Sequence, residues 1–398
     1  MRYIKSFVFV FAFILLVQPL QAQQIAVKGE TVYTMAGDPI NDGVVLIKNG
    51  KIERVGPASN ITVPSGYTIH EAKVVSPGLI DAHSVVGLAG HLNQDNDQDQ
   101  LETSSAIQPE LRAMDAYNAR EALVGHLRDH GITTVHTGHG PGALISGQTM
   151  IVKTTGETVE EALVDSTTML AFTMGSMISG AIKKPGTRSK GVAMLRQQLI
   201  KARSYAKKRA NGDDYSVNLG MEALADLLDG KIKALVTVHK ANDIMTALRL
   251  QQEFDFPMVV DGGAEAYLII DELKAAGVPV IVHPTMMRTY GDGKNASFET
   301  AGKLYQAGIP VAFQSGYEGY VPKTRVILFE AGVAAANGLG KENALKVLTI
   351  EAAKLLGINN RVGSLEAGKD ADIAMFDGDP LEYTSHITGV IIDGVKVK

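Results

Sequence analysis

Histidine residues recur at one kind of place in this sequence, directly after short apolar segments that have the length of buried strands. The histidines in such positions are His83, His136, His139, His239 and His283. Imidazoles gathered at one edge of a sheet could bind a divalent metal, which lowers the pKa of bound water and so produces a nucleophile near neutral pH. The same residues could instead hydrogen-bond rim loops or a polar ligand, and the residue types alone leave both interpretations open.

The segment around His83 limits what such a metal site could be. Alternate side chains of a β-strand point to the same side, so two imidazoles two residues apart can reach one ion. Here the order is His83, Ser84, Val85, and an aliphatic side chain stands at the second position. With one imidazole from this strand, the sequence predicts at most one divalent ion, zinc being the best match to histidine ligands. A chain that has no catalytic activity would bind no metal ion.

Other catalytic motifs are incomplete in the sequence. Residues 138–148 are rich in glycine but lack the Gly-Lys-Ser/Thr of a phosphate-binding loop, and there is no Gly-x-Ser-x-Gly nucleophile turn. The acidic residues 93–102 have Gln100 where a calcium loop of the EF-hand type needs glycine. These departures argue against nucleotide binding, serine hydrolysis and an EF-hand.

The histidines are separated by a repeated alternation of strand and helix patterns. Apolar runs of strand length occupy residues 78–82, 132–135, 148–152, 170–174, 234–238, 258–260, 278–282 and 310–313. Helical periodicity occupies residues 115–130, 192–209, 242–253, 265–276 and 344–356. This α/β alternation predicts a parallel sheet closed by outer helices, a (β/α)8 TIM-type barrel over residues 76–357. Its chemistry would lie at the C-terminal ends of the strands.

Both ends of the chain have the pattern of short strands and tight turns. Asn49 and Gly50 lie between two apolar runs and predict a hairpin with a type I′ turn. Residues 371–376 and 389–397 repeat this character near the C-terminus. We therefore expect a small discontinuous β-sandwich domain formed by residues 23–75 and 358–398.

The N-terminus predicts export. Arg2 and Lys5 precede an apolar run over residues 7–17, which is shorter than the roughly 20 residues that cross a membrane. We expect a signal peptide over residues 1–22, and a protein that is soluble and periplasmic or extracellular, with no membrane partner. The chain has no cysteine, which removes disulfides, thiolate ligands and a nucleophilic thiol.

Charge argues against a nucleic-acid partner. The formal net charge is −5, and the basic cluster of Lys183, Lys184, Arg188 and Lys190 is expected to be a solvated loop. Proteins that bind nucleic acid usually present a basic face instead.

Taken together, the sequence resembles the secreted, imidazolonepropionase-like branch of the amidohydrolase superfamily over essentially the whole mature chain. The resemblance is carried by residues 42–52, 77–83, 109–118, 146–148, 240–249 and 362–373. It implies an eight-stranded barrel, a flanking β-sandwich, one or two divalent metals, and hydrolysis of amide or related carbon–nitrogen bonds.

The resemblance also implies a role for individual residues. His83 and His239 match imidazole ligands of the family, whereas Val85 takes the place of another ligand. Ser176, Gly262 and Ser315 also stand where the family has ligands, and Ser315 replaces the aspartate that binds metal and accepts a proton from water. The residues expected on the substrate side are Lys153, Ser176 and Gly262, with Lys153 in the role of a bridging lysine.

Two functions follow from this pattern. One is a hydrolase of small amides, cyclic amides or dipeptide-like compounds, with a single metal on His83, His239 and His283 and with His136 or His139 as weaker candidates. The other is a non-catalytic homologue that binds a small ligand or assembles with an intact amidohydrolase relative. Either form could be a homo-oligomer.

Overall fold

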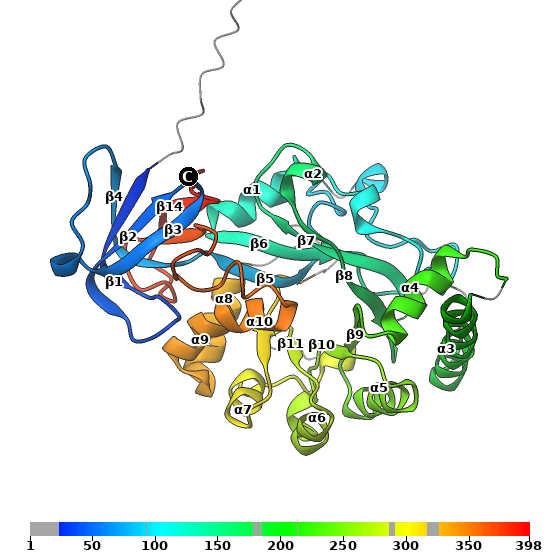
Figure 1. The fold of residues 1–398 in the computed structure, drawn as a ribbon. Coiled ribbons are helices and arrows are strands. Elements are labelled where there is room, and N and C mark those ends of the chain that lie inside the picture. The colour runs from blue at the N-terminus through cyan, green and yellow to red at the C-terminus, as the bar shows by residue number, and fades with distance from the viewer. Residues whose placement is uncertain are drawn as a thin grey trace, which may run out of the picture.

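The computed structural model describes residues 24–92, 94–176, 178, 182, 185–212, 214–285, 291–316 and 326–398. The expected signal peptide and the basic residues Lys183 and Lys184 lie outside these ranges. Figure 1 shows two parts, a β-domain that carries the C-terminus and a larger barrel with helices on its outside. Within the described residues, no helix is long and apolar enough to cross a membrane.

The two ends of the chain form one seven-stranded sheet, as expected for a shared β-domain. Its strands, in chain order, are β1 (Ile25–Val32), β2 (Ile40–Lys48), β3 (Lys51–Pro57), β4 (Thr68–Pro77), β13 (Ile373–Phe376), β14 (Ile387–Ile392) and β15 (Val395–Lys396). In space the order is β15-β14-β13-β4-β1-β2-β3. Asn49 and Gly50 have φ angles of 54° and 76°, which confirms the type I′ turn. The turn at Gly394 packs on it, because a Cβ on Gly394 would lie 2.7 Å from the Cα of Gly50.

The second sheet has eight strands and forms the barrel. They are β5 (Leu79–Ser84), β6 (Ile132–Gly138), β7 (Ile145–Lys153), β8 (Leu163–Thr173), β9 (Lys233–Val238), β10 (Met258–Gly262), β11 (Val280–Val282) and β12 (Val311–Phe313). Neighbours in the sheet follow chain order from β5 to β12. A parallel bridge between Ser84 and Gly316 joins the first strand to the end of the last. The number of strands and the barrel class are as expected.

The direction of one strand differs from the expectation. β7 runs antiparallel to both β6 and β8, so the sheet is mixed rather than parallel. The reason is the connection, since only residues 139–144 separate β6 from β7. A parallel neighbour needs a crossover of about a dozen residues or more, whereas a hairpin needs only a few.

Helices cover the outside of the barrel. They are α1 (Ala122–Asp129), α2 (Val159–Ala162), α3 (Arg188–Asn211), α4 (Leu219–Leu228), α5 (Ala241–Phe254), α6 (Ile270–Ala276), α7 (Thr300–Gln306), α8 (Ile327–Ala334), α9 (Lys341–Val347) and α10 (Ile350–Leu356). The helix expected over residues 344–356 is split at Thr349, whose ψ is −98° and whose Oγ1 donates to the Leu345 carbonyl at 2.6 Å. The helix expected from residue 115 begins only at Ala122.

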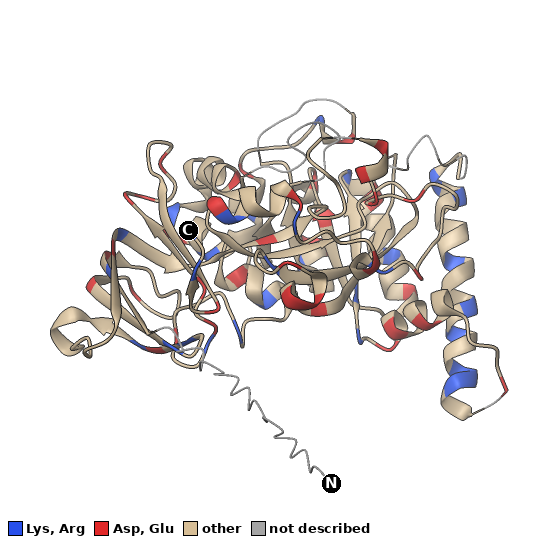
Figure 2. Cartoon of the chain, turned by 90° about the horizontal axis from the view of Figure 1, so that it is seen from above, with Lys and Arg blue, Asp and Glu red and all other residues tan. Residues whose placement is uncertain are grey.

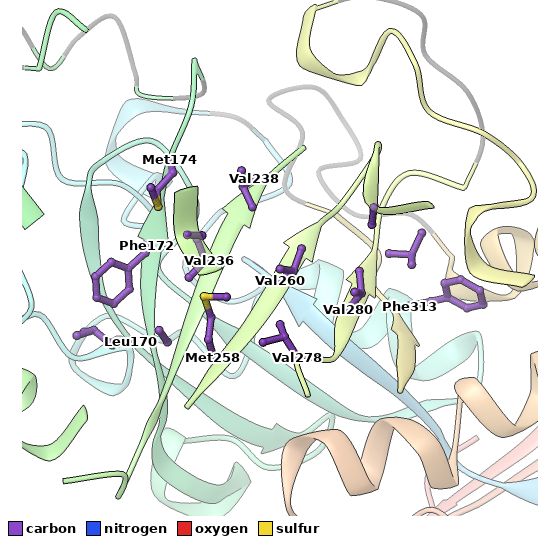
Figure 3. Packing of buried hydrophobic residues seen from close by; sticks show 14 of the residues in the cluster. Leu170, Phe172, Met174, Val236, Val238, Met258, Val260, Val278, Val280 and Phe313 are labelled. Atoms are coloured by element: carbon purple, nitrogen blue, oxygen red, sulfur yellow. The ribbon is translucent and has the colours of Figure 1, made fainter. Parts of the chain in front are cut away.

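The main core lies between the sheet and these helices. Figure 3 shows alternate residues of neighbouring strands in it, such as Leu170 and Phe172 of β8 and Val236 and Val238 at β9. Alternation follows from the period of two along a strand. Residues on the other face of the same strands, such as Met169 of β8 and Leu235 of β9, belong to a second cluster inside the barrel.

Lys153 joins the barrel to the terminal β-domain. It ends β7 and pairs with Thr134 near the start of β6, because β7 is antiparallel. Its Nζ lies 2.5 Å from Asp372, 3.3 Å from Asp370 and 3.4 Å from Asp393. Lys153 is therefore at the opposite end of the barrel from the C-terminal ends of β5 and β9. The structure thus corrects the expectation that Lys153 faces the substrate.

The ion pairs of Lys153 predict a large loss of stability when its charge is removed. Burial lowers the pKa of Lys153, but the three carboxylates outweigh burial and hold this pKa above its ordinary value. Lys153→Met would leave Asp372 buried without its cation, and we expect unfolding in urea to show a loss of about 3–5 kcal/mol.

Lys51→Met is the matched control for this substitution. Lys51 also contacts Asp370, at 2.5 Å, but its side chain is 52% exposed. We expect a loss of at most about 1 kcal/mol, because Lys51 is half-exposed and the buried Asp370 keeps Lys153 and Arg361 as partners. Equal losses in the two variants would contradict the role given to Lys153.

Candidate functional site

A layer of polar side chains lies beyond the apolar interior of the barrel. The interior cluster includes Leu235, Val259, Ile281 and Ala312. Residues two positions later share the same face of each strand and come closer to its C-terminal end. They are Thr237, Asp261, His283 and Gln314, and all are buried. The apolar interior therefore changes to a polar one where chemistry was expected.

Asp261 is in contact with three polar side chains that lie on other strands or directly after one. Thr237 Oγ1 donates to its Oδ2 at 2.6 Å, and Gln314 Nε2 donates to its Oδ1. His83 Nδ1 lies 3.1 Å from the same Oδ1. Burial raises the pKa of Asp261, but His83, Thr237 and His283 together hold this pKa below its ordinary value. Asp261 is thus a buried carboxylate that stays charged and takes its partners from within the protein.

Asp81 is a second buried carboxylate, two residues before His83 on β5. Both the backbone N–H of Ser315, at 3.0 Å, and its hydroxyl donate to Asp81. Burial raises the pKa of Asp81 to about 6, against the opposing effects of Ser315 and His83. The structure therefore gives Ser315 a defined task, since it closes the barrel by bonding β5 to the end of β12.

His136 is held by bonds at both ring nitrogens. Nδ1 is 2.7 Å from the Ala82 carbonyl, and Nε2 is 2.6 Å from Thr149 Oγ1. Burial, with a smaller effect of His83, lowers the pKa of His136 to about 3, so the ring is neutral. A neutral ring satisfies both contacts by donating from Nδ1 and accepting the Thr149 hydroxyl at Nε2. Neither nitrogen is then available to a metal.

His239 follows β9 and lies against Gly262. A Cβ on Gly262 would be 2.5 Å from the Cε1 of His239 and 2.8 Å from its Nδ1. Gly262 also has a φ of 90°, which favours glycine. Burial lowers the pKa of His239, while Asp261 raises it and His283 lowers it further. The missing side chain at position 262 thus makes room for the imidazole of the neighbouring strand.

Two of the expected site residues lie elsewhere. Ser176 is exposed, and its hydroxyl donates to Asp292, which also accepts from Lys240 Nζ at 3.2 Å. His139 packs against Gly147, whose added Cβ would be 2.3 Å from its ring. Burial lowers the pKa of His139 to about 4, while Asp99 and the backbone of Gln100 act to raise it.

The expected residues that the structure brings together are His83, His136, His239, Gly262, His283 and Ser315. Four further members of the cluster were not expected from the sequence, namely Asp81, Thr237, Asp261 and Gln314. Their signal in the sequence is a polar residue inside or just after an apolar strand, as in Val259-Val260-Asp261. Such a residue needs a buried partner, but the sequence does not say which one.

The divalent metal implied by the resemblance does not fit these side chains as they are arranged. Asp261 is bonded by Thr237, Gln314 and His83, and His136 uses both nitrogens internally. Within the part of the chain that the structure describes, no group of three or more His, Asp or Glu residues could hold a metal ion. The cluster can stabilise the barrel and present imidazoles to a ligand.

The sequence and the fold are both similar to those of known proteins. The model of the Amidohydrolase family matches residues 74–397. The crystal structure of an amidohydrolase from Thermotoga maritima MSB8 is 31% identical, has a TM-score of 0.88, and aligns over 94% of this chain and 99% of that one.

Two relatives are similar at lower identity. The imidazolonepropionase of Brucella anthropi is 24% identical over 397 residues, which cover 85% of this chain and 87% of that protein. Amidohydrolase tasK of Hapsidospora irregularis is 25% identical over 88% of this chain but only 39% of its own length. The chain therefore spans well under half of that second relative.

The packing of His239 on Gly262 predicts a steric penalty for any side chain at position 262. We expect Gly262→Ala to lower the free energy of unfolding by about 1–3 kcal/mol more than Gly230→Ala does. Gly230 is the matched control, because its φ is 72° but nothing lies within 4 Å of an added Cβ. Urea unfolding measures both variants, and an equal loss would mean that His239 moves aside freely.

The neutral histidines predict a loss of stability in acid. His136 and His139 have folded pKa values of about 3 and about 4, against 6.5 for a free imidazole. Below pH 6.5 these histidines bind protons in the unfolded chain but not in the folded one, so their contribution to the free energy of unfolding falls as pH falls from about 6.5 to 4. Asp81, whose folded pKa is about 6, acts in the opposite direction because the folded chain binds its proton first.

His139→Gln tests this pH dependence. Replacing this one histidine should reduce the fall in the free energy of unfolding between pH 6.5 and 4.5 by about 2–3 kcal/mol, as measured by urea unfolding at each pH. Parallel pH profiles for the variant and the unaltered protein would show that His139 titrates normally.

Proposed function

Because this chain belongs to the amidohydrolase family, we propose that it is a member whose barrel centre is held by internal ion pairs instead of a metal. In this proposal it binds a small amide or dipeptide-like ligand and does not hydrolyse it through metal-bound water. The family and its relatives support a place among hydrolases of carbon–nitrogen bonds. Members of the family typically use a divalent metal such as zinc.

The observation that carries the proposal is the contact between His83 and Asp261. A metal-bound carboxylate directs its oxygen lone pairs at the ion, but here Thr237, Gln314 and His83 take up the Asp261 oxygens. Freeing Asp261 for an ion would remove the acceptor that the buried Thr237 and Gln314 now use. Each unsatisfied buried group costs about 1–3 kcal/mol, which favours the internal arrangement.

The residue that would receive a proton from water is also missing. Ser315 stands at the end of β12, and its hydroxyl donates to Asp81. A serine hydroxyl is not a base at neutral pH, and here its proton is already engaged. Both residues are fully buried, with 0% exposure, which further supports a structural task for the pair.

One observation favours the competing function, a hydrolase with a single metal. Nδ1 of His239 is buried and has no hydrogen-bond partner in the part of the chain that the structure describes. His239, His283 and Asp261 affect one another electrostatically. A rearrangement that released Asp261 from Gln314 would therefore offer a metal two imidazoles and a carboxylate, which is a usual ligand set for zinc.

The cellular location of the protein and its partner are also part of the proposal. We propose export to the periplasm or the extracellular space, with an intact amidohydrolase relative or a second copy of the chain as partner. Val85, Ser176, Gly262 and Ser315 stand where the family has metal ligands, which supports a partner that carries the catalytic site. Purification of the native protein from its source, followed by mass spectrometry of what remains bound, would identify such a partner.

Metal content separates the two functions. Elemental mass spectrometry on protein purified without chelators or a histidine tag should find no more metal than a buffer blank, even after incubation with excess zinc and gel filtration. His239→Ala should leave this result unchanged. About one tightly held ion per chain, lost in His239→Ala, would overturn the proposal in favour of the single-metal hydrolase.

A further inference from the structure

A cavity of about 630 Å³ lies outside the barrel, between the N-terminal half of α3 and the helix α5. Figure 1 shows these two helices side by side, on the part of the barrel far from the terminal β-domain. This volume is in the range of about 300–1,000 Å³ that small-molecule sites occupy. None of the histidines discussed above lines it.

The cavity has an apolar floor. Leu144, Met174 and Leu195 line it but are at most 5% exposed, so the apolar surface open to a ligand comes from the partly buried Ile178, Pro185 and Val192. Met174 lies just beyond the end of β8, as Figure 3 shows. A ligand that fills this floor must carry an apolar group, because burying polar atoms there without partners costs free energy.

Cations predominate among the charged residues that line the cavity. They are Arg188, Arg196 and Arg249, against one acid, Asp243. Nε of Arg188 donates to both Asp243 oxygens, at 2.8 and 3.1 Å, and Nε of Arg196 lies 2.9 Å from Glu253. These two charges are therefore compensated.

Arg249 is the cation in this cavity that has hydrogen-bond donors left for a ligand. Among the residues that the structure describes, its side chain has one hydrogen-bond partner, Thr246 Oγ1, at 2.7 Å from Nη2. A guanidinium carries five donors and can bind a carboxylate through two parallel hydrogen bonds. Arg249 is also exposed, so a ligand can reach it from solvent.

Another part of the cavity wall is formed by Gly175, whose φ is 80°. A Cβ at this position would lie 2.7 Å from Asp243 Oδ2. The absence of a side chain lets Asp243 hold Arg188, while Ser176 and Lys240 both bond Asp292 beside it. Ser176, which the resemblance assigns to the barrel centre, thus belongs to the edge of this cavity.

The helix α3, which forms one side of the cavity, is basic. Figure 2 shows Lys and Arg along the whole of α3, whose sequence holds eight of these residues and no Asp or Glu. Arg188 and Arg196 pair with acids of α5 and Arg209 pairs with an acid of α4, so the remaining Lys and Arg residues of α3 supply the attraction for anions.

We propose that this cavity binds a small organic carboxylate, with the carboxylate on Arg249 and an apolar chain on Ile178, Pro185 and Val192. The site goes beyond the proposed function and does not depend on whether the barrel centre holds a metal. The chemistry it selects is one negative charge joined to an aliphatic or aromatic group.

Isothermal titration with hexanoate, and with uncharged hexanamide as its matched probe, tests the site. Hexanoate should bind more tightly than hexanamide, and Arg249→Gln should weaken hexanoate binding about 10-fold, as expected for loss of a charged hydrogen bond, while leaving hexanamide unchanged. Arg54→Gln, which removes an exposed arginine on β3, is the control and should bind hexanoate normally.

A second variant fills the cavity. Ser189 lines it and is exposed, so Ser189→Trp should fold normally and weaken both probes. The proposal is overturned if hexanoate does not bind the unaltered protein, if Arg249→Gln and Arg54→Gln bind it equally, or if Ser189→Trp has no effect. Metal content plays no part in this experiment, so its outcome is separate from that of the proposed function.

Discussion

The buried carboxylate of Asp261 is the constraint on which the centre of the barrel depends. A charge with no access to water must be paired and hydrogen-bonded by the protein itself. Asp261 obtains this from His83 on β5, Thr237 on β9 and Gln314 directly after β12. One side chain of β10 therefore ties together strands that are far apart in the sequence. In an enzyme of this fold a metal ion would exert the same attraction on ligands from several strands.

Charge is buried at both ends of the barrel, but for different purposes. At the C-terminal ends of the strands, Asp81 and Asp261 hold the barrel wall together. At the other end, Lys153 reaches into the terminal β-domain and binds Asp372. The layer between them is apolar and includes Leu235 and Ile281. The two polar ends fix the arrangement of strands and domains, while the apolar layer supplies most of the favourable burial.

Local features of this fold could be predicted from the sequence, whereas partners distant in the chain could not. The Asn49-Gly50 turn and the eight strands follow from neighbouring residues, and histidines at strand ends predicted where the polar layer lies. The direction of β7 depends on the short connection over residues 139–144, which the apolar pattern of the strand does not reveal. That direction also decides the position of Lys153. The partners of Asp81 and Asp261 come from other strands, so only the closed barrel identifies them.

The shared terminal sheet has a consequence for the order in which the protein can be completed. β4 pairs with β1 on one side and with β13 on the other, and the turn at Gly394 rests on the turn at Gly50. During translation, β1 to β4 leave the ribosome first, yet one edge of β4 stays open until β13 is made. Open strand edges are sites of mispairing between chains. The strand β13 therefore completes the domain that β1 to β4 begin. A chain interrupted before β13 keeps an unpaired edge on β4, which can pair with other chains.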